Sequence, residues 1–168
     1  MILENIIQSD SVLCNVPARS KKHCLEILSE LLTRPNPEIA NEEAFTRLIE
    51  RERLGCTLLD KGIAFPHCRV NGVKRHTAAL IKLQEPVDFD SIDGENVDLV
   101  FGLMVPFELD AADYSEIKSI AHFLRDESLR ARMRDATSSS ASFTMRCWPV
   151  GANRAAKCTA HNRIQCRM

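Results

Sequence analysis

The feature that most constrains the fold of this 168-residue chain is a nearly unbroken apolar run, DLVFGLMV, at residues 98–105. A strand covered on both faces reads as a continuous apolar run, whereas a half-exposed strand alternates with polar residues. The run therefore predicts a central strand. Pro106 closes it, because proline has no N–H to donate to a neighbouring strand.

Helices are predicted on both sides of this strand along the chain. In residues 20–33, leucines recur at helical spacing after Ser20, a candidate N-cap. Asn36-Pro37-Glu38 is typical of a second helix start, with Asn36 as the N-cap, and this helix is expected to run to about Arg51. The other predicted helices are residues 113–125 and about 126–136.

Further strands are predicted at residues 11–16, 62–66 and 76–84, the last stopped by Glu85-Pro86. Residues 54–62, with glycines at both ends, are expected to form a loop, and Asn71-Gly72 a tight turn. Two helices, then strands, then helices indicate an α/β domain whose mixed sheet is flanked by helices.

The charges divide the chain into two parts. All 23 acidic residues lie in residues 1–136, whereas residues 137–168 are basic and have no acid. The sequence therefore predicts one domain over 1–136 and an irregular, cysteine-containing tail over 137–168. A reading-frame change near residue 137, with loss of a last helix, would explain the switch.

Composition excludes several functions. The net charge of −1 gives no argument for nucleic acid as a partner, and no apolar run is long enough for membrane insertion. Without a signal peptide, a cytoplasmic protein with free thiols is expected. The tail's cysteines and histidine fit no standard zinc spacing, so neither a metal nor a cofactor is predicted.

A candidate site combines the end of the second helix with the loop and strand that follow it. Arg51, the loop residues Gly55, Cys56 and Thr57, and Arg69 offer guanidinium groups, backbone amides and a hydroxyl, which suit a phosphate. His67, at the exit of the predicted strand, offers a nucleophile that can take a phosphoryl group. A histidine at a strand end is more often structural, so spacing alone leaves both interpretations open.

The pattern that these residues form together bears on the choice between a structural and a functional role for His67. Arg51-Glu52-x-x-Gly55-Cys56-Thr57, followed by GIAFPH at residues 62–67, resembles the signature of the fructose/mannitol-type IIA domains of the bacterial sugar phosphotransferase system, and most of all their nitrogen-regulatory branch. VDLVFGLMVP and KKHCLEILSELL also resemble segments of that family. The resemblance covers roughly residues 1–136.

The resemblance implies both a fold and a function. The fold is a mixed sheet flanked by helices. His67 would accept a phosphoryl group from phosphorylated HPr or its nitrogen-branch paralogue, with Arg51 beside the ring and Thr57 nearby. The phosphorylation state would regulate partners such as potassium transporters and sensor kinases.

The chain departs from the family pattern at positions that affect this expectation. Leu58 and Asp60 replace loop glycines, and Asp60 would repel a phosphate if it points inward. Asp113 stands where the family has a second histidine, and it could hydrogen-bond His67 or repel its phosphate. Two alternatives therefore stay open: a degenerate IIA-like module that binds partners without being phosphorylated, and a sugar-specific IIA component.

Overall fold

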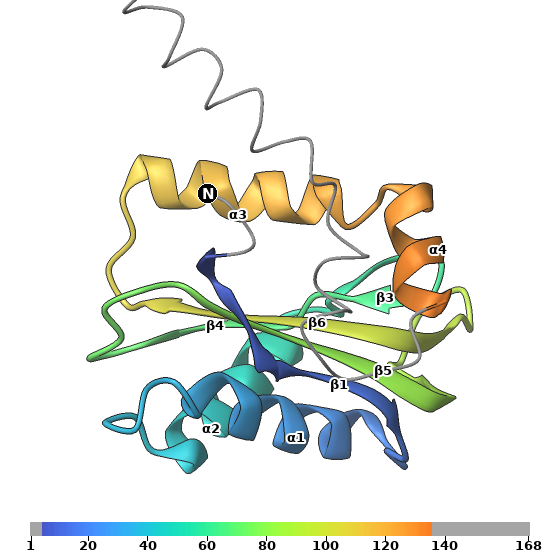
Figure 1. Cartoon of the computed structure of the whole chain (residues 1–168), viewed down its shortest axis with the longest axis horizontal. Helices are drawn as coiled ribbons and strands as arrows, with labels where there is room; N and C mark the ends of the chain where they lie inside the picture. Colours follow the sequence, from blue (N-terminus) through green and yellow to red (C-terminus); the bar gives the residue numbers. More distant parts are fainter. Residues whose placement is uncertain (1–4, 136–168) are drawn as a thin grey trace, which may run out of the picture.

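A computed structural model describes residues 5–135, which form a six-stranded mixed sheet between two layers of helices (Figure 1). The helices are α1 (Lys21–Thr33), α2 (Asn41–Arg53), α3 (Ala111–Phe123) and α4 (Glu127–Asp135), and the strands are β1 (Ile7–Val16), β2 (Leu58–Asp60), β3 (Ile63–Ala64), β4 (His67–Val70), β5 (Thr77–Asp88) and β6 (Asn96–Pro106). This architecture confirms the predicted fold class. The predicted irregular tail, 137–168, lies outside the described residues.

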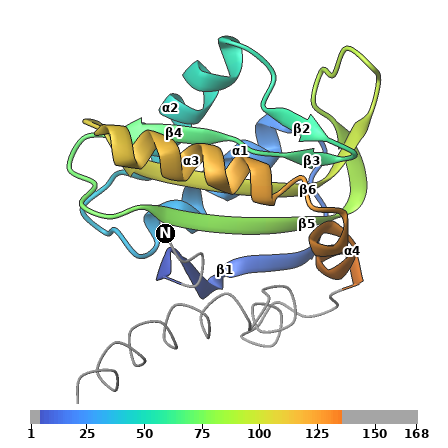
Figure 2. The same ribbon diagram turned by 90° about the horizontal axis from the view of Figure 1, so that it is seen from above.

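β6 occupies the middle of the sheet, as its apolar run predicts. The strand order is β1-β5-β6-β3-β2, and β4 also pairs with β6 (Figure 2). β6 is antiparallel to β5 and parallel to β3 and β4, whereas β1 is parallel to β5. Its residues from Leu99 to Val105 are buried, because helices cover both faces.

β3 and β4 behave as one strand with an interruption. Ile63 pairs with Leu99 and His67 with Leu103, so the offset along β6 is the same on both sides of the break. Pro66 has no N–H, yet its carbonyl oxygen still accepts from the Leu103 N–H at 3.0 Å. His67 therefore begins β4, and the expectation that it stands at the exit of a buried strand is wrong.

The hairpin partner of β3 explains why the His67 side of the sheet is accessible. Within residues 5–135, β2 pairs with β3, whereas β4 has β6 as its only strand partner. β4 is consequently an edge of the sheet. The His67 side chain is only partly buried there, although the strand beside it is fully covered.

Two apolar cores fill the space on either face of the sheet. Val100 belongs to the core under α1 and α2, and Phe101 to the core under α3 and α4, as strand alternation requires. α1 packs directly onto the backbone of β6. A Cβ on Gly102 would lie 2.3 Å from Leu28 Cδ1, so this position needs glycine.

The second helix begins later than predicted. α2 starts at Asn41 after Ala40, and Asn36 is not its N-cap. The Asn36 side chain instead donates to the Leu32 carbonyl at 3.2 Å and to Thr77 Oγ1 at 3.0 Å. Asn36 therefore satisfies an orphan carbonyl at the end of α1 and ties that helix to β5.

Other boundaries also differ from the sequence prediction. β1 begins at Ile7, four residues earlier than expected, and the predicted loop 54–62 contains β2. β5 continues through Pro86, where its register against β6 shifts, so the proline is accommodated in an irregularity instead of ending the strand. No helix within residues 5–135 is long and apolar enough to cross a membrane.

Candidate functional site

His67 is held by a hydrogen bond on each ring nitrogen. Arg51 Nε donates to His67 Nε2 at 3.3 Å, and His67 Nδ1 lies 3.0 Å from the Phe65 carbonyl oxygen. Because a guanidinium can only donate, Nε2 must accept and Nδ1 must carry the proton. This tautomer leaves the lone pair of Nε2 directed toward the arginine.

The pKa of His67 is lowered below its usual value of 6.5. Burial is the largest cause, because it disfavours the imidazolium, and the positive charges of Arg51 and Arg69 act in the same direction. The hydrogen bond to the Phe65 carbonyl opposes the shift without cancelling it. His67 is therefore neutral at pH 7, as a nitrogen nucleophile must be.

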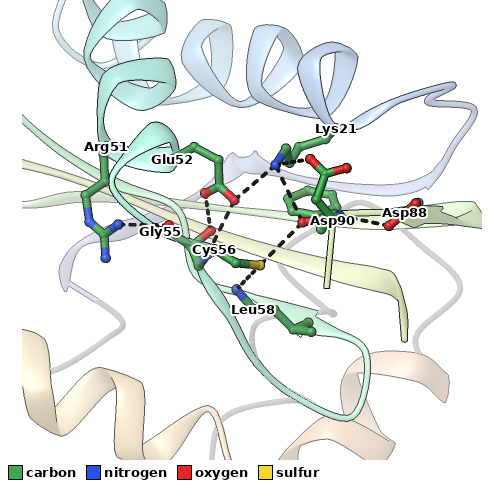
Figure 3. A network of polar contacts seen from close by, with 10 residues as sticks. Lys21, Arg51, Glu52, Gly55, Cys56, Leu58, Asp88 and Asp90 are labelled. Atoms are coloured by element: carbon green, nitrogen blue, oxygen red, sulfur yellow. Dashed lines mark hydrogen bonds and ion pairs between the residues drawn. The ribbon is translucent and has the colours of Figure 1, made fainter. Parts of the chain in front are cut away.

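Arg51 reaches the histidine from the last turn of α2. Its Nη1 also donates to the Gly55 carbonyl at 3.2 Å (Figure 3). Together with the bond to His67, the guanidinium therefore bridges the helix end, the loop and the ring. Gly55 has a φ of 154°, which residues with a side chain rarely adopt. The structure thus brings together Arg51, Gly55 and His67, which the sequence placed in one site.

Thr57 is held by Glu52, an acid that lies in the quoted sequence pattern but to which the sequence analysis gave no role in the site. The buried Thr57 hydroxyl donates to Glu52 Oε2 at 2.6 Å, and its N–H lies 3.4 Å from Glu52 Oε1. The Thr57 carbonyl in turn accepts from the Phe65 N–H at 2.8 Å. Thr57 therefore links Glu52 to the residue before Pro66, and its hydroxyl proton is directed toward Glu52.

A pattern in the sequence indicated this burial of Glu52. Ala44, Leu48 and Glu52 are the buried residues of α2, and they recur every four positions. That spacing puts an acid on the core-facing side of a helix. An acid there requires a partner, because an isolated buried charge is costly.

Lys21 supplies that partner from the first turn of α1. Its Nζ lies 3.5 Å from Glu52 Oε1 and 2.6 Å from Asp90 Oδ2, as Figure 3 shows. Burial would lower the pKa of Lys21, but its hydrogen bond to Asp90 and the charges of Glu52 and Asp90 outweigh burial and raise the pKa. Lys21 is therefore a permanent cation behind the loop.

Cys56 fastens the same loop to the end of β5. Its Sγ lies 3.3 Å from the Phe89 carbonyl oxygen and 3.4 Å from the Leu58 N–H (Figure 3). Cys56 and Lys21 also face a cavity of about 460 Å³ beside α1 and α2. His67 does not line this cavity, so the cavity is separate from the histidine–arginine pair.

Arg69 and Asp113 lie with α3 instead of touching the His67 ring. The Arg69 guanidinium stacks 5.6 Å from the centre of the Tyr114 ring. Asp113 Oδ1 is 3.2 Å from His76 Nε2, and its Oδ2 accepts from the Asp110 N–H at 3.1 Å. The sequence analysis left open whether Asp113 would hydrogen-bond His67 or repel its phosphate, and the structure places its carboxylate against His76.

The two substituted loop positions are compatible with an ordinary backbone. Leu58 and Asp60 both belong to β2, and neither has a positive φ. The left-handed residues of this turn are Lys61, at φ 45°, and Gly62, at φ 81°. Asp60 is exposed at the end of its strand.

The fold and the site define a small mixed α/β domain that presents a histidine–arginine pair at the edge of its sheet. The chain belongs to the family of the phosphoenolpyruvate-dependent sugar phosphotransferase system, EIIA 2, whose model matches residues 5–144. The match covers all of the described residues.

Similar proteins agree with this assignment. A nitrogen regulatory protein from Pseudomonas aeruginosa is 39% identical over 141 residues, which cover 84% of this chain and 92% of the relative. The crystal structure of the nitrogen regulatory protein IIA-Ntr from Neisseria meningitidis has a TM-score of 0.76 and 32% identity, and covers 83% of this chain and 94% of its own. The IIA mannitol structure from Escherichia coli shares the fold, with a TM-score of 0.67 and 22% identity over 83% of this chain and 96% of its own.

Proposed function

We propose that this protein is a phosphohistidine carrier of the nitrogen-related phosphotransferase system. His67 accepts a phosphoryl group from phosphorylated HPr or its nitrogen-branch paralogue, and the phosphorylation state regulates partner proteins. The observation that carries the proposal is the paired hydrogen bonding of His67, with Arg51 on Nε2 and the Phe65 carbonyl on Nδ1. The nitrogen regulatory relatives support the regulatory part.

The geometry favours one nitrogen and one direction of attack. The Nε2 lone pair forms the new N–P bond, while the P–N bond of the donor's phosphohistidine breaks and its electron pair returns to the donor ring. The proton on Nδ1 remains hydrogen-bonded to the Phe65 carbonyl oxygen, which stabilises the positive charge of the phosphorylated ring. Arg51 Nε, which donates to the Nε2 lone pair in the free protein, leaves it as the phosphorus approaches and donates to the phosphoryl oxygens instead.

Thr57, Gly55 and Cys56 support this reaction by shaping the loop. Glu52 fixes Thr57, Arg51 holds the Gly55 carbonyl, and Cys56 anchors the loop at the Phe89 carbonyl. Phosphoryl transfer depends mainly on positioning and charge stabilisation, so a rigid loop beside the histidine is what the chemistry requires. Arg69, two residues along β4, adds positive charge to the same edge.

A degenerate, non-phosphorylated module is the second candidate. The direction of the Thr57 hydroxyl favours it, because a hydroxyl that donates to Glu52 at 2.6 Å does not donate its proton to a phosphate on His67. The argument from Asp113 is weaker, because its carboxylate contacts His76 and not the His67 ring. A sugar-specific IIA component remains an alternative, because the mannitol IIA structure has the same fold.

Intact mass after incubation with phosphoenolpyruvate, enzyme I and HPr tests the proposal. The wild-type chain should gain one phosphate, His67→Ala should gain none, and His122→Ala, on the exposed part of α3, should react like wild type. Repeating the assay with the nitrogen-branch paralogue identifies the donor. Absence of a gain with both donors, while an ordinary IIA domain is phosphorylated in the same mixture, would favour the degenerate module.

Regulation needs a separate test. Phosphorylated and unphosphorylated protein should differ in affinity for a sensor kinase or a potassium transporter, because the phosphate adds roughly −1.5 to −2 of charge. Binding measured with wild type and His67→Ala, each with and without the active donor chain, separates the two states. Equal binding in all four conditions would contradict regulation through His67.

A further inference from the structure

We propose that His76, Asp113 and Glu116 form a binding site for a divalent first-row transition-metal ion such as Zn²⁺. The three residues come from two elements: His76 directly precedes β5, and the two acids lie in the first turns of α3. One ligand atom from each residue can be chosen so that all three lie within 4.8 Å of one another. The proposal is independent of phosphoryl transfer at His67.

The closest pair in this cluster already has the spacing of two ligands on one ion. Asp113 Oδ1 lies 3.2 Å from His76 Nε2. Zinc bonds to histidine nitrogen and carboxylate oxygen are about 2.0–2.2 Å long, so two such ligands stand roughly 3.0–3.4 Å apart. An ion can therefore replace the hydrogen bond between them without a change in the backbone.

Two of the proposed ligands are held in place by their surroundings. The His76 side chain is only 10% exposed, which restricts the ring. The other oxygen of Asp113 accepts from the Asp110 N–H at 3.1 Å, as part of the capping box of α3. Outer hydrogen bonds of this kind orient a ligand before the metal arrives.

Glu116 completes the cluster from one turn further along α3. Residues three apart lie on the same face of a helix, so Glu116 and Asp113 both face His76. Glu116 Oε2 is 3.8 Å from His76 Nδ1, and its side chain is 37% exposed. To complete a site on Nε2 this carboxylate would have to turn from Nδ1, and its exposure leaves a route for the ion from solvent.

The donor set decides the class of ion. One imidazole nitrogen with two carboxylate oxygens suits Zn²⁺, Mn²⁺ or Co²⁺, whereas Mg²⁺ and Ca²⁺ prefer oxygen ligands alone. The sequence analysis expected no metal and considered only the tail's cysteines and histidine, since nothing in the 37 positions between His76 and Asp113 indicates that they are in contact.

The place of this cluster in the fold gives it a structural consequence. Arg69 pairs with Val105 on one side of β6, and Thr77, next to His76, pairs with Met104 on the other. The start of α3 thus meets the sheet at two points, with Tyr114 over Arg69 and Asp113 against His76. An ion at the second point would fasten α3 beside the strand that begins with His67.

A Co²⁺ titration of the full chain, followed by absorption, tests the proposal. Bound Co²⁺ shows visible bands, and thiolate ligation adds a strong sulfur-to-metal band in the near ultraviolet, so the tail's cysteines are distinguished from an imidazole–carboxylate site. We expect visible bands without the sulfur band. His76→Gln and Glu116→Gln should each weaken binding roughly tenfold or more, whereas His122→Gln on the same helix should bind like wild type.

Stability in the presence of Zn²⁺ supplies the second readout. Zn²⁺ should raise the Tm of wild type and of His122→Gln, and raise it less in His76→Gln and Glu116→Gln. If His76→Gln does not fold, Glu116→Gln still tests the site, because its side chain is partly exposed. Binding that is equal in all variants, a dominant sulfur band, or no spectral change at millimolar Co²⁺ would each overturn the proposal.

Discussion

α1 and α3 are both thirteen residues long and lie on opposite faces of the same sheet, yet they are attached to it in different ways. α1 has seven buried residues and presses Leu28 against the backbone of β6 at Gly102. α3 has one buried residue, Ile120, and its start contacts the sheet through charged and aromatic side chains. Figure 1 shows the two helices above and below the strands.

The difference assigns different roles to the two faces around His67. The α1 and α2 side provides a fixed base, since Glu52 and Lys21 connect both helices to the Thr57 loop. The α3 side is attached through its polar first turns, through the buried Ile120 and through partly buried residues around Ile120. We infer that changes on the first face act on global stability, whereas changes on the second act locally.

The largest expected effect comes from overfilling the contact between α1 and β6. Gly102→Ala should lower the free energy of unfolding by about 2–3 kcal/mol, because the new Cβ would overlap Leu28. Leu28→Ala alone should cost about 3 kcal/mol through lost packing. Urea denaturation of the double variant should show a loss smaller than the sum by at least about 1 kcal/mol.

A control cycle uses the opposite face. Gly102→Ala combined with Ile120→Ala should be additive, because Ile120 packs in the other core. If the losses of unfolding free energy from Gly102→Ala and Leu28→Ala were also additive, α1 would not rest on β6 at Gly102.

Glu52 is expected to have the next largest effect. Glu52→Gln should destabilise the protein by about 1.5–3 kcal/mol, because it weakens a buried, charge-assisted hydrogen bond to Thr57. It should also slow phosphorylation of His67 by donor protein, since the loop is less well positioned. The matched control is Glu50→Gln, whose exposed ion pair with Arg47 contributes at most about 1 kcal/mol. An equal rate in Glu52→Gln and wild type would limit Glu52 to a structural role.

The helix caps give a smaller and more direct comparison. Ser20 Oγ accepts from the His23 N–H at 3.1 Å in α1, and Asp110 Oδ1 accepts from the Asp113 N–H at 2.8 Å in α3. Ser20→Ala and Asp110→Ala should each cost about 1 kcal/mol of helix stability. Amide hydrogen exchange should accelerate only locally, in the first turns of α3, for Asp110→Ala. If amide protection in α1 and α3 were the same in Ser20→Ala as in Asp110→Ala, the inference that the two helices are attached differently would be contradicted.

Sequence patterns predicted the parts of the fold that depend on local burial. The continuous apolar run of β6 and the spaced leucines of α1 were sufficient, because helices and central strands repeat a core-facing pattern. Asn36-Pro37 misled the prediction of α2, since the same residues suit the end of one helix and the start of the next. β2 was missed because three residues do not establish a period.

The candidate site likewise contains contacts that the sequence predicted and contacts that it did not. Arg51, Gly55 and His67 were predicted as neighbours, and the structure brings them into contact. The pairing of Lys21 with Glu52 across 31 positions, and of His76 with Asp113, depends on the packing of helices onto the sheet. Such long-range contacts leave no spacing signal in one sequence.

The smallest expected effect is the pH dependence that His67 contributes to stability. Its pKa in the folded protein is lowered, whereas a histidine in the unfolded chain titrates near 6.5. The unfolded state therefore binds this proton more readily, so the contribution to stability is complete above about pH 6.5 and is lost as the pH falls through the folded pKa. His67→Gln should reduce the slope of unfolding free energy against pH in this window.

The two arginines permit a final comparison of the two sides of the site. Burial lowers the pKa of His67 most, Arg51 adds to the effect from α2, and Arg69 adds less from beneath Tyr114. Arg51→Gln should therefore raise the pKa of His67 more than Arg69→Gln does, as measured by NMR titration of the ring proton between the two nitrogens. The reverse order would mean that Arg69 leaves Tyr114 for the histidine in solution, and that the α3 side controls the charge of the site.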